Sequence, residues 1–257
     1  MVKNNEEILK NCIENEVPLG HFSRKWNPKM SKYLLMEKSN THIIDVNCTL
    51  NELNKSCEKL MSIVATGGKV LFVCTKKIGR SYVESVANDL EMPFVTEKWF
   101  GGILTNFSVV KKMNKKIDSL NMIINSPSFK YLSKKEQIKL QRNINKKAIV
   151  LNGISKKMNR HPSAMIVVDA KKENIAIKEA NKIGIPIFGL VDTNVDPDLI
   201  SNPIPCNDDS LSSIVYIIER LKYSIAEGLK KLKDNTANPQ EKREIHKKVE
   251  KKGVTIK

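Results

Sequence analysis

Four short and almost entirely apolar segments recur along this chain, and amphipathic stretches lie between them. The apolar segments are HIIDV (42–46), KVLFVC (69–74), AMIVVD (164–169) and PIFGLVD (186–192). Their length and their β-branched residues predict strands that are buried on both faces. Residues 50–64, 81–90 and 173–183 repeat apolar side chains every three or four positions, which predicts helices. Strands and helices that alternate in this way predict an α/β fold, in which helices cover both faces of a parallel sheet.

One long segment, residues 103–158, interrupts the alternation. It contains no strand pattern, and the apolar residues of its first half follow a heptad-like spacing that is typical of paired helices. Pro127 ends that pattern, because proline does not fit inside a helix. Ser133 and Glu136 have the spacing of a capping box at the start of a second helix. We therefore expect an inserted antiparallel helical hairpin with coiled-coil-like packing.

This insertion divides the chain into four expected parts. Residues 1–102 would hold an N-terminal arm and the first part of the α/β domain, and residues 103–158 the basic hairpin. Residues 159–228 would complete the α/β domain, and residues 229–257 would form a mobile basic tail. The tail has almost no apolar periodicity and is rich in lysine, which is typical of a solvated segment.

Positive charge is concentrated on the hairpin. The chain has 44 Lys and Arg residues against 28 Asp and Glu residues, a formal net charge of +16. Residues 101–160 alone carry fourteen basic and two acidic side chains. A lysine-rich composition bias would change which basic residue is used, but it would not remove the acidic ones. The pattern therefore predicts a polyanionic partner such as a nucleic acid.

A second basic stretch, GHFSRKWNPKMSKY (20–33), mixes cationic and aromatic side chains. This mixture suits a nucleic-acid strand, because bases stack on aromatic rings while cations meet phosphates. It is equally consistent with an arm that Trp26 and Pro28 anchor to the protein core. Composition alone leaves both interpretations open.

Sequence signatures of catalysis are weak. The chain has no G-x-G-x-x-G, no G-x-x-x-x-G-K-[ST] and no H-E-x-x-H motif. The adjacent Gly101 and Gly102 therefore predict a tight entry into the hairpin rather than a nucleotide loop. The acidic run DTNVDPD (192–198) starts like an EF-hand loop, but Pro197 stands where that loop requires glycine. We interpret this run and the NDD stretch (207–209) as turns and helix caps.

Cysteine use and hydropathy indicate a soluble intracellular protein. The five cysteines include no Cys-x-x-Cys pair and are odd in number, so we expect buried free thiols, and we expect no metal ion or cofactor. The longest apolar runs are far too short to cross a bilayer. The polar opening MVKNNEEILK is unlike a signal peptide.

Seven stretches of the chain resemble one family, in this order: GHFSRKWNPKM, THIIDV, GGKVLFVCTKK, KWFGGILTNF, HPSAMIVVDA, AIKEANKIGIPIFGLVDTNVDPDLI and IPCNDDSLSSI. The family is the bacterial and organellar small-subunit ribosomal protein number two, and the resemblance spans residues 17–228. It implies a flavodoxin-like parallel sheet with an inserted helical hairpin. It also implies a non-catalytic structural role in the small ribosomal subunit during translation. The implied partners are small-subunit rRNA and neighbouring ribosomal proteins, among them the first protein of that subunit (S-one). The implied location is the bacterial cytoplasm or the interior of an organelle.

The resemblance and the basic segments together define the residues expected to bind RNA. They are His21, Arg24, Lys25, Trp26, Asn27, Lys29, Lys32, Lys76, Lys77, Asn106, Lys111, Lys112, Lys115 and Lys116. Gly101 and Gly102 are the expected hinge between the sheet and the hairpin. The competing hypothesis is a nucleotide-binding α/β enzyme that uses the carboxyl ends of its strands, near Thr75, Asp169 and Asp192. The missing phosphate motifs and the basic hairpin count against that enzyme.

Overall fold

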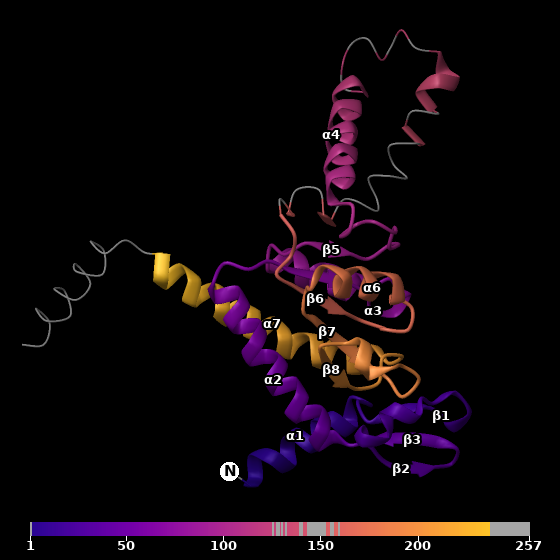
Figure 1. Ribbon diagram of the computed structural model, residues 1–257, viewed down its shortest axis with the longest axis vertical. Coiled ribbons are helices and arrows are strands. Elements are labelled where there is room, and N and C mark those ends of the chain that lie inside the picture. Colours follow the sequence, from indigo (N-terminus) through magenta and orange to yellow (C-terminus); the bar gives the residue numbers. More distant parts are fainter. Residues whose placement is uncertain are drawn as a thin grey trace, which may run out of the picture.

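A five-stranded parallel sheet forms the centre of the protein (Figure 1). The computed structural model describes residues 2–124, 126, 129, 131, 133–138, 141–142, 153–154, 157–158 and 160–236. The strands are β4 (Val70–Val73), β5 (Phe94–Val95), β6 (Ala164–Val167), β7 (Ile187–Val191) and β8 (Asn202–Pro205). Their spatial order is β5-β4-β6-β7-β8, and every neighbouring pair is parallel. Numbered along the chain, this is the 2-1-3-4-5 order of flavodoxin-like folds. The predicted fold class is confirmed.

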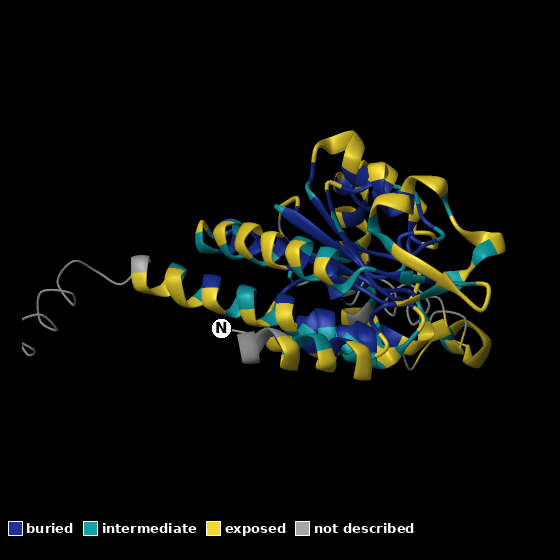
Figure 2. Cartoon of the chain, turned by 90° about the horizontal axis from the view of Figure 1, so that it is seen from below, coloured by how far each residue is buried: buried dark blue, intermediate teal, exposed yellow. Residues whose placement is uncertain are grey.

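Helices cover both faces of this sheet, because side chains alternate between the two faces along each strand. In β4, Val70 and Phe72 join the core on one face, and Leu71 and Val73 join the core on the other. The first core is closed by α2 (Val46–Ala65), α3 (Lys77–Asp89) and α7 (Leu211–Thr236). The second core is closed by α6 (Asn174–Ile183) and by the residues that lead into α4 (Phe107–Ile124). Figure 2 shows buried residues in the strands and on the inner sides of the helices.

Capping residues mark the start of α2 and the end of α6. The Asp45 carboxylate accepts a hydrogen bond from the backbone N–H of Asn47 at 2.9 Å and so caps the start of α2. Helix α6 ends at Gly184, whose φ of +80° lies in the left-handed region that favours glycine. The predicted helices at 50–64, 81–90 and 173–183 are therefore α2, α3 and α6.

The N-terminal part of the chain differs from the expectation. Helix α1 (Val2–Glu14) leads into a separate antiparallel sheet with the strand order β1-β3-β2. Its strands are β1 (Leu19–Phe22), β2 (Leu34–Lys38) and β3 (Thr41–Ile44), and two 3₁₀ turns, Ser23–Lys25 and Pro28–Tyr33, join β1 to β2. The prediction that HIIDV (42–46) belongs to the parallel sheet is wrong. Only alternate residues of β3 are buried, and a short apolar run does not distinguish that environment from a strand buried on both faces.

The first half of the predicted hairpin is helix α4, which projects beyond β5 at one end of the molecule (Figure 1). The helix begins at Phe107, whereas the heptad-like pattern places its start at residue 103; residues 101–106 are turns instead. The predicted capping box is confirmed, because the Glu136 carboxylate accepts from the backbone N–H and the hydroxyl of Ser133. Most of the second half of the hairpin lies outside the described residues.

The C-terminal part differs from the expectation in two ways. Strand β8 was not expected, because it has the sequence NPIP and prolines in a run normally argue against a strand. The sequence predicts a helix over residues 210–228, but helix α7 continues as far as Thr236, so the first residues of the predicted tail are helical; residues 237–257 lie outside the described part. None of the helices that the structure describes combines the length and apolar composition that crossing a bilayer requires.

Candidate nucleic-acid interface

The loop that leads into α4 is organised around one carboxylate, that of Glu179 on α6. Glu179 Oε1 accepts hydrogen bonds from the backbone N–H of Gly102 at 2.7 Å and from Trp99 Nε1 at 3.1 Å. Its Oε2 accepts from the backbone N–H groups of Leu104 at 3.0 Å and Thr105 at 3.1 Å, and from the Thr105 hydroxyl at 3.2 Å. Donors from both ends of the loop therefore converge on a single buried side chain.

This arrangement explains the two adjacent glycines. The loop binds an anion, as helix N-termini with free N–H groups do, but the anion is an internal carboxylate and not a nucleotide phosphate. Gly102 has a φ of +95°, which only glycine adopts without strain, whereas a Cβ added at Gly101 would meet no heavy atom within 4 Å. Hence Gly102 alone is required by the backbone, and a hinge motion at this pair stays a prediction.

The charge of Glu179 is stabilised in place. Burial raises the pKa of a carboxyl group, but the hydrogen bonds from Gly102, Trp99, Thr105 and Leu104 outweigh this effect and hold the pKa of Glu179 below its ordinary value. No local pattern marks this residue in the sequence, because its partners lie 74 to 80 positions earlier in the chain.

Helix α4 carries a basic surface beyond this loop. Its seam residues Phe107, Val110 and Ile117 are buried in the second core. Lys111 Nζ lies 4.8 Å from the centroid of the Phe107 ring, a cation–π contact. Among the described residues, no carboxylate pairs with any of the exposed lysines of this helix, which are Lys111, Lys112, Lys115 and Lys116.

The Gly20–Tyr33 stretch is docked on the α/β domain. The backbone N–H of Asn27 donates to the carbonyl oxygen of Thr193 at 2.8 Å, and the side chain of Met30 is fully buried in the second core. The Trp26 ring lies 4.9 Å from the His42 ring, and 37% of Trp26 remains exposed. The stretch is therefore anchored, with Met30 as its deepest residue, and it still offers exposed groups.

The polar residues of this stretch are used unequally. The Asn27 side chain accepts from the backbone N–H of Lys29 at 3.0 Å and caps a 3₁₀ turn. Lys29 Nζ lies 2.7 Å from Asp196 and 3.0 Å from Asp198. Asp196 also accepts from the backbone N–H of Asp198, so the predicted turn role of Asp196 is confirmed. The exposed cations that remain are Arg24, Lys25 and Lys32.

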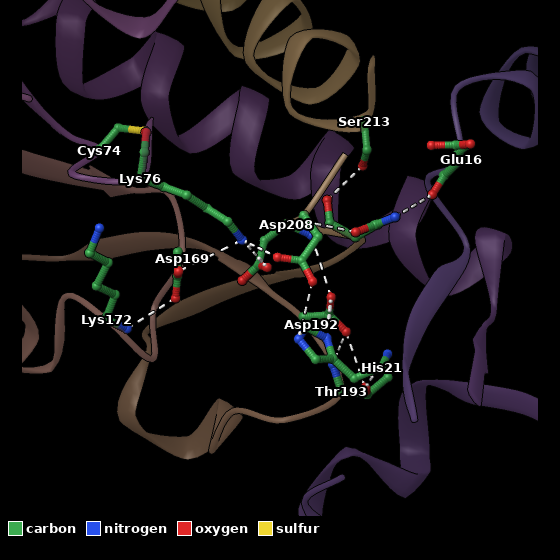
Figure 3. Close-up of polar contacts among 12 residues, drawn as sticks. Glu16, His21, Cys74, Lys76, Asp169, Lys172, Asp192, Thr193, Asp208 and Ser213 are labelled. Carbon is green, nitrogen blue, oxygen red and sulfur yellow. Dashed lines mark hydrogen bonds and ion pairs between the residues drawn. The ribbon is translucent and has the colours of Figure 1, made fainter. Parts of the chain in front are cut away.

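The carboxyl ends of the strands carry a charged cluster (Figure 3). His21 lies between two carboxylates, with Nδ1 2.9 Å from Asp192 and Nε2 3.2 Å from Asp209. The hydrogen bond to Asp192 raises the pKa of His21, although burial opposes it. A neutral imidazole donates from one nitrogen only, so contacts at both nitrogens favour the imidazolium form.

Lys76 is the second cation of this cluster. Its Nζ lies 2.8 Å from Asp208, 2.6 Å from Asp209 and 3.7 Å from Asp169. Burial and the neighbouring Asp192 carboxylate raise the pKa of Asp208 to about 7, against the opposing effect of Lys76. Burial lowers the pKa of Lys76, but its hydrogen bonds to Asp208 and Asp209 raise it by more. The sequence predicts a turn or helix cap at Asp208. Its carboxylate instead forms an ion pair with Lys76 at the edge of the sheet.

The remaining groups that an enzyme would use are engaged by the chain itself. The Thr75 backbone N–H donates to Glu173 at 3.1 Å, and the Thr75 hydroxyl donates to the same oxygen. Asp169 accepts from the backbone N–H of Lys172 at 3.0 Å. Asp192 accepts from the backbone N–H of its neighbour Thr193 as well as facing His21. At the three positions expected for an enzyme, each polar side chain is therefore already hydrogen-bonded or ion-paired to another group of the chain.

The same edge holds the group of side chains that could best bind a metal ion among the described residues. His21, Asp192 and Asp209 each offer one ligand atom, and these atoms lie within 4.8 Å of one another. Their carboxylates face different nitrogens of the imidazole, however, and Lys76 already supplies a cation to Asp209. The geometry as it stands is that of an imidazolium and an ammonium between carboxylates.

The residues expected to bind RNA therefore differ in how far the chain itself engages them. His21, Lys29 and Lys76 form ion pairs within the chain. Asn106 is exposed at the start of α4, next to Ser108. The other cations are exposed and have no carboxylate partner in the described part of the chain; they are Arg24, Lys25, Lys32, Lys77, Lys111, Lys112, Lys115 and Lys116.

Comparison with known proteins gives a consistent result. Residues 12–228 match the family described as Ribosomal protein S2. The chain is 43% identical over 234 residues to the small ribosomal subunit protein uS2 of Amoebophilus asiaticus, which covers 91% of this chain and 74% of that protein. It is 45% identical to the uS2 proteins of Cytophaga hutchinsonii and Karelsulcia muelleri. These matches cover 87% and 84% of this chain, and 88% and 97% of those proteins.

Proposed function

This chain is a member of the ribosomal protein S2 family, and from that membership we propose which of its surfaces bind RNA. It is a structural constituent of the small ribosomal subunit and not an enzyme. Its partners are accordingly ribosomal RNA and other proteins of that subunit. The hypothesis of a nucleotide-binding enzyme has no support, since Thr75, Asp169 and Asp192 are all bound by groups of the chain.

The exposed lysines of α4 form the main RNA surface in this proposal. The observation that carries it is that Lys111, Lys112, Lys115 and Lys116 are exposed without a carboxylate partner among the described residues, whereas the cations of the strand edge are paired. Unpaired cations can neutralise phosphates and release their counterions, which is the main sequence-independent term in nucleic-acid binding. The boundaries of the hairpin, residues 103–158, belong to the same proposal.

The Gly20–Tyr33 stretch supplies a second and smaller RNA surface. Arg24, Lys25 and Lys32 are exposed there, and Trp26 is partly exposed for stacking. Figure 1 shows α4 at one end of the molecule and the β1-β3-β2 sheet at the other. Both surfaces would therefore contact RNA only if the chain lies along or between RNA segments.

Protein neighbours are proposed at the N-terminal sheet. Leu19, Phe22, Leu35 and Met36 on its two outer strands are 45% to 63% exposed. Exposed apolar side chains of this size favour contact with another protein. We propose the first protein of the small subunit (S-one) as one of these neighbours, and ribosomes of a bacterial cytoplasm as the location, because the relatives compared come from bacteria.

Binding to small subunits that lack this protein tests the main surface. We expect changing Lys112, Lys115 and Lys116 to Gln to preserve the helix, because glutamine is a good helix former. Each lost phosphate contact should make the slope of log K against log salt shallower by about 0.7–0.9. A triple variant that keeps the wild-type affinity and slope, with its helicity intact, would move the RNA contact to the Gly20–Tyr33 stretch.

A further inference from the structure

A hollow of about 520 Å³ lies where α4 leaves the α/β domain. Its lining comes from both ends of the inserted segment, and consists of Thr105, Phe107, Ser108, Lys111, Arg160 and His161. Residues from about fifty positions apart therefore form one concave surface at the root of the basic helix. The sequence pattern does not single out Arg160 or His161.

The chemistry of this lining is that of an anion site. The described lining contains two cationic side chains, an imidazole and two hydroxyl groups, and no acidic residue. Phe107 and Ser108 are the first two residues of α4, and the N-terminus of a helix carries partial positive charge. The charged side chains in the described lining and the start of α4 therefore favour a negative ligand.

The side chains around the hollow are held in place by contacts within the protein. The His161 ring lies 5.0 Å from the ring of the buried Phe107, and Lys111 Nζ lies 4.8 Å from that same ring. Arg160 Nη2 donates to the carbonyl oxygen of Gly67 at 2.8 Å, so its guanidinium is anchored at one end and keeps further donors free. Groups arranged in advance bind with a smaller entropy loss.

Not every polar group of the lining is available. The Thr105 hydroxyl donates its proton to Glu179, so it has none left for a ligand. The Ser108 hydroxyl lies 3.4 Å from Asn106, a long contact that it can exchange. Lys111, Arg160 and His161 are exposed at the rim, which leaves the hollow open on one side. An open, polar and cationic hollow suits a passing phosphodiester backbone rather than an enclosed small molecule.

We propose that this hollow binds a phosphodiester of ribosomal RNA, with Lys111 and Arg160 as its ionic partners and Ser108 and His161 as hydrogen-bond donors. The inference rests on the proposed function, because it takes α4 to be the RNA-facing element. It adds a specific site at the root of the helix, where backbone capture would fix the direction in which the rest of α4 runs along the RNA.

The test measures binding to small subunits that lack this protein, over a range of salt concentrations, with four proteins. These are the wild type, K111Q/R160Q, the triple variant of Lys112, Lys115 and Lys116, and K178Q/K182Q as the control. The control removes two exposed lysines of α6 that do not line the hollow. We expect K111Q/R160Q to bind roughly tenfold or more weakly, and its salt slope to be shallower by about 1.4–1.8. The control should match the wild type.

Two further variants separate binding from folding. Arg160→Lys alone keeps the positive charge at this position. Its salt slope should therefore stay close to that of the wild type and not fall to that of K111Q/R160Q. Lys111→Glu leaves the Arg160–Gly67 contact intact and should weaken binding more than Lys111→Gln, with unchanged thermal unfolding. If K111Q/R160Q binds like the wild type while the triple variant is weakened, the hollow is not a phosphate site and the helix surface stands. If the wild type itself fails to bind, the proposed function is wrong and the inference falls with it.

Discussion

The carboxylate of Glu179 lies 2.7 Å from the backbone nitrogen of Gly102, so a helix of the α/β domain holds the turn from which the basic helix starts. This contact joins residues 77 positions apart. Leu104 and Thr105 also donate their N–H groups to Glu179, so one carboxylate holds the turn that immediately precedes α4. The direction of the basic surface is thus set by an acidic residue of α6.

Replacing Glu179 by Gln should destabilise the protein at neutral pH. A glutamine side chain has one oxygen and a donating NH₂ group, so it leaves buried N–H groups without an acceptor. We expect a loss of about 2–3 kcal/mol in the free energy of unfolding. The pKa of Glu179 is lowered in the fold, so its contribution is full above the ordinary value and is lost as the pH falls through the folded value. Urea unfolding of both proteins from pH 7 to pH 3.5 should show the gap closing.

Glu173→Gln is the matched control, because burial raises the pKa of Glu173 instead. The wild type then gains stability relative to this variant as the pH falls through that raised value. The two glutamine variants should therefore drift in opposite directions. Parallel curves would show that the Glu179 carboxylate is not charged in the fold.

Alanine at the two glycines should have unequal effects. Gly102 has a φ of +95°, so Gly102→Ala should cost about 1–2 kcal/mol of stability. Gly101 has no positive φ and no atom within 4 Å of an added Cβ, so Gly101→Ala should leave the unfolding midpoint almost unchanged. Thermal or urea unfolding measures both. Equal losses would mean that the turn is not shaped as described.

Methionine at Lys76 should be far more damaging than methionine at Lys29. Lys76→Met leaves the buried Asp208 carboxylate without its ion-pair partner, which should cost about 2–4 kcal/mol. Since the pKa of Asp208 is about 7, its protonation limits the loss at pH 6, and the deficit should grow at pH 8. Lys29 lies in an exposed pair, so its replacement should change the unfolding midpoint little. A small, pH-independent effect at Lys76 would contradict the ion-pair role.

The α/β domain should survive loss of the arm only if the root of the arm is kept. Ile103, Leu104, Phe107 and Ile154 are buried in the second core, although the sequence pattern assigns them to the hairpin. Replacing residues 112–150 by a short Gly/Ser linker should leave cooperative unfolding. Replacing residues 103–156 removes all four, at about 2–5 kcal/mol each, which exceeds the stability of a typical domain. If both proteins unfold cooperatively, the root does not belong to the core.

The sequence predicts the parallel sheet because β4, β6 and β7 are buried on both faces and therefore read as unbroken apolar runs. The same signal misleads at HIIDV (42–46), where the chain alternates between buried and half-buried positions in a different sheet. Strand β8 is hidden by Pro203 and Pro205. It lies at the edge of the sheet, where a missing N–H on the outer side costs nothing.

The site is predicted less completely than the fold. The spacing of basic residues correctly finds exposed lysines on α4, because exposure on a helix follows from local periodicity. It does not find that His21, Lys29 and Lys76 are paired, since their carboxylates come from residues more than 90 positions away. The role of Glu179 cannot be predicted from the sequence for the same reason. Contacts between residues far apart in the chain depend on the fold, and a short stretch of sequence does not contain both partners.

The docking of the Gly20–Tyr33 stretch also sets an order of events during synthesis. The backbone N–H of His21 donates to the Thr193 hydroxyl, a partner 172 positions later. At about 5–20 residues per second, Thr193 is made roughly 9 to 34 s after His21. Until then the cationic and aromatic stretch can contact only the neighbouring strand β3 and lacks its docking site on the α/β domain. The amino-terminal end of this protein is therefore translated first and docked late, and its basic stretch stays open to other polyanions while the chain is being made.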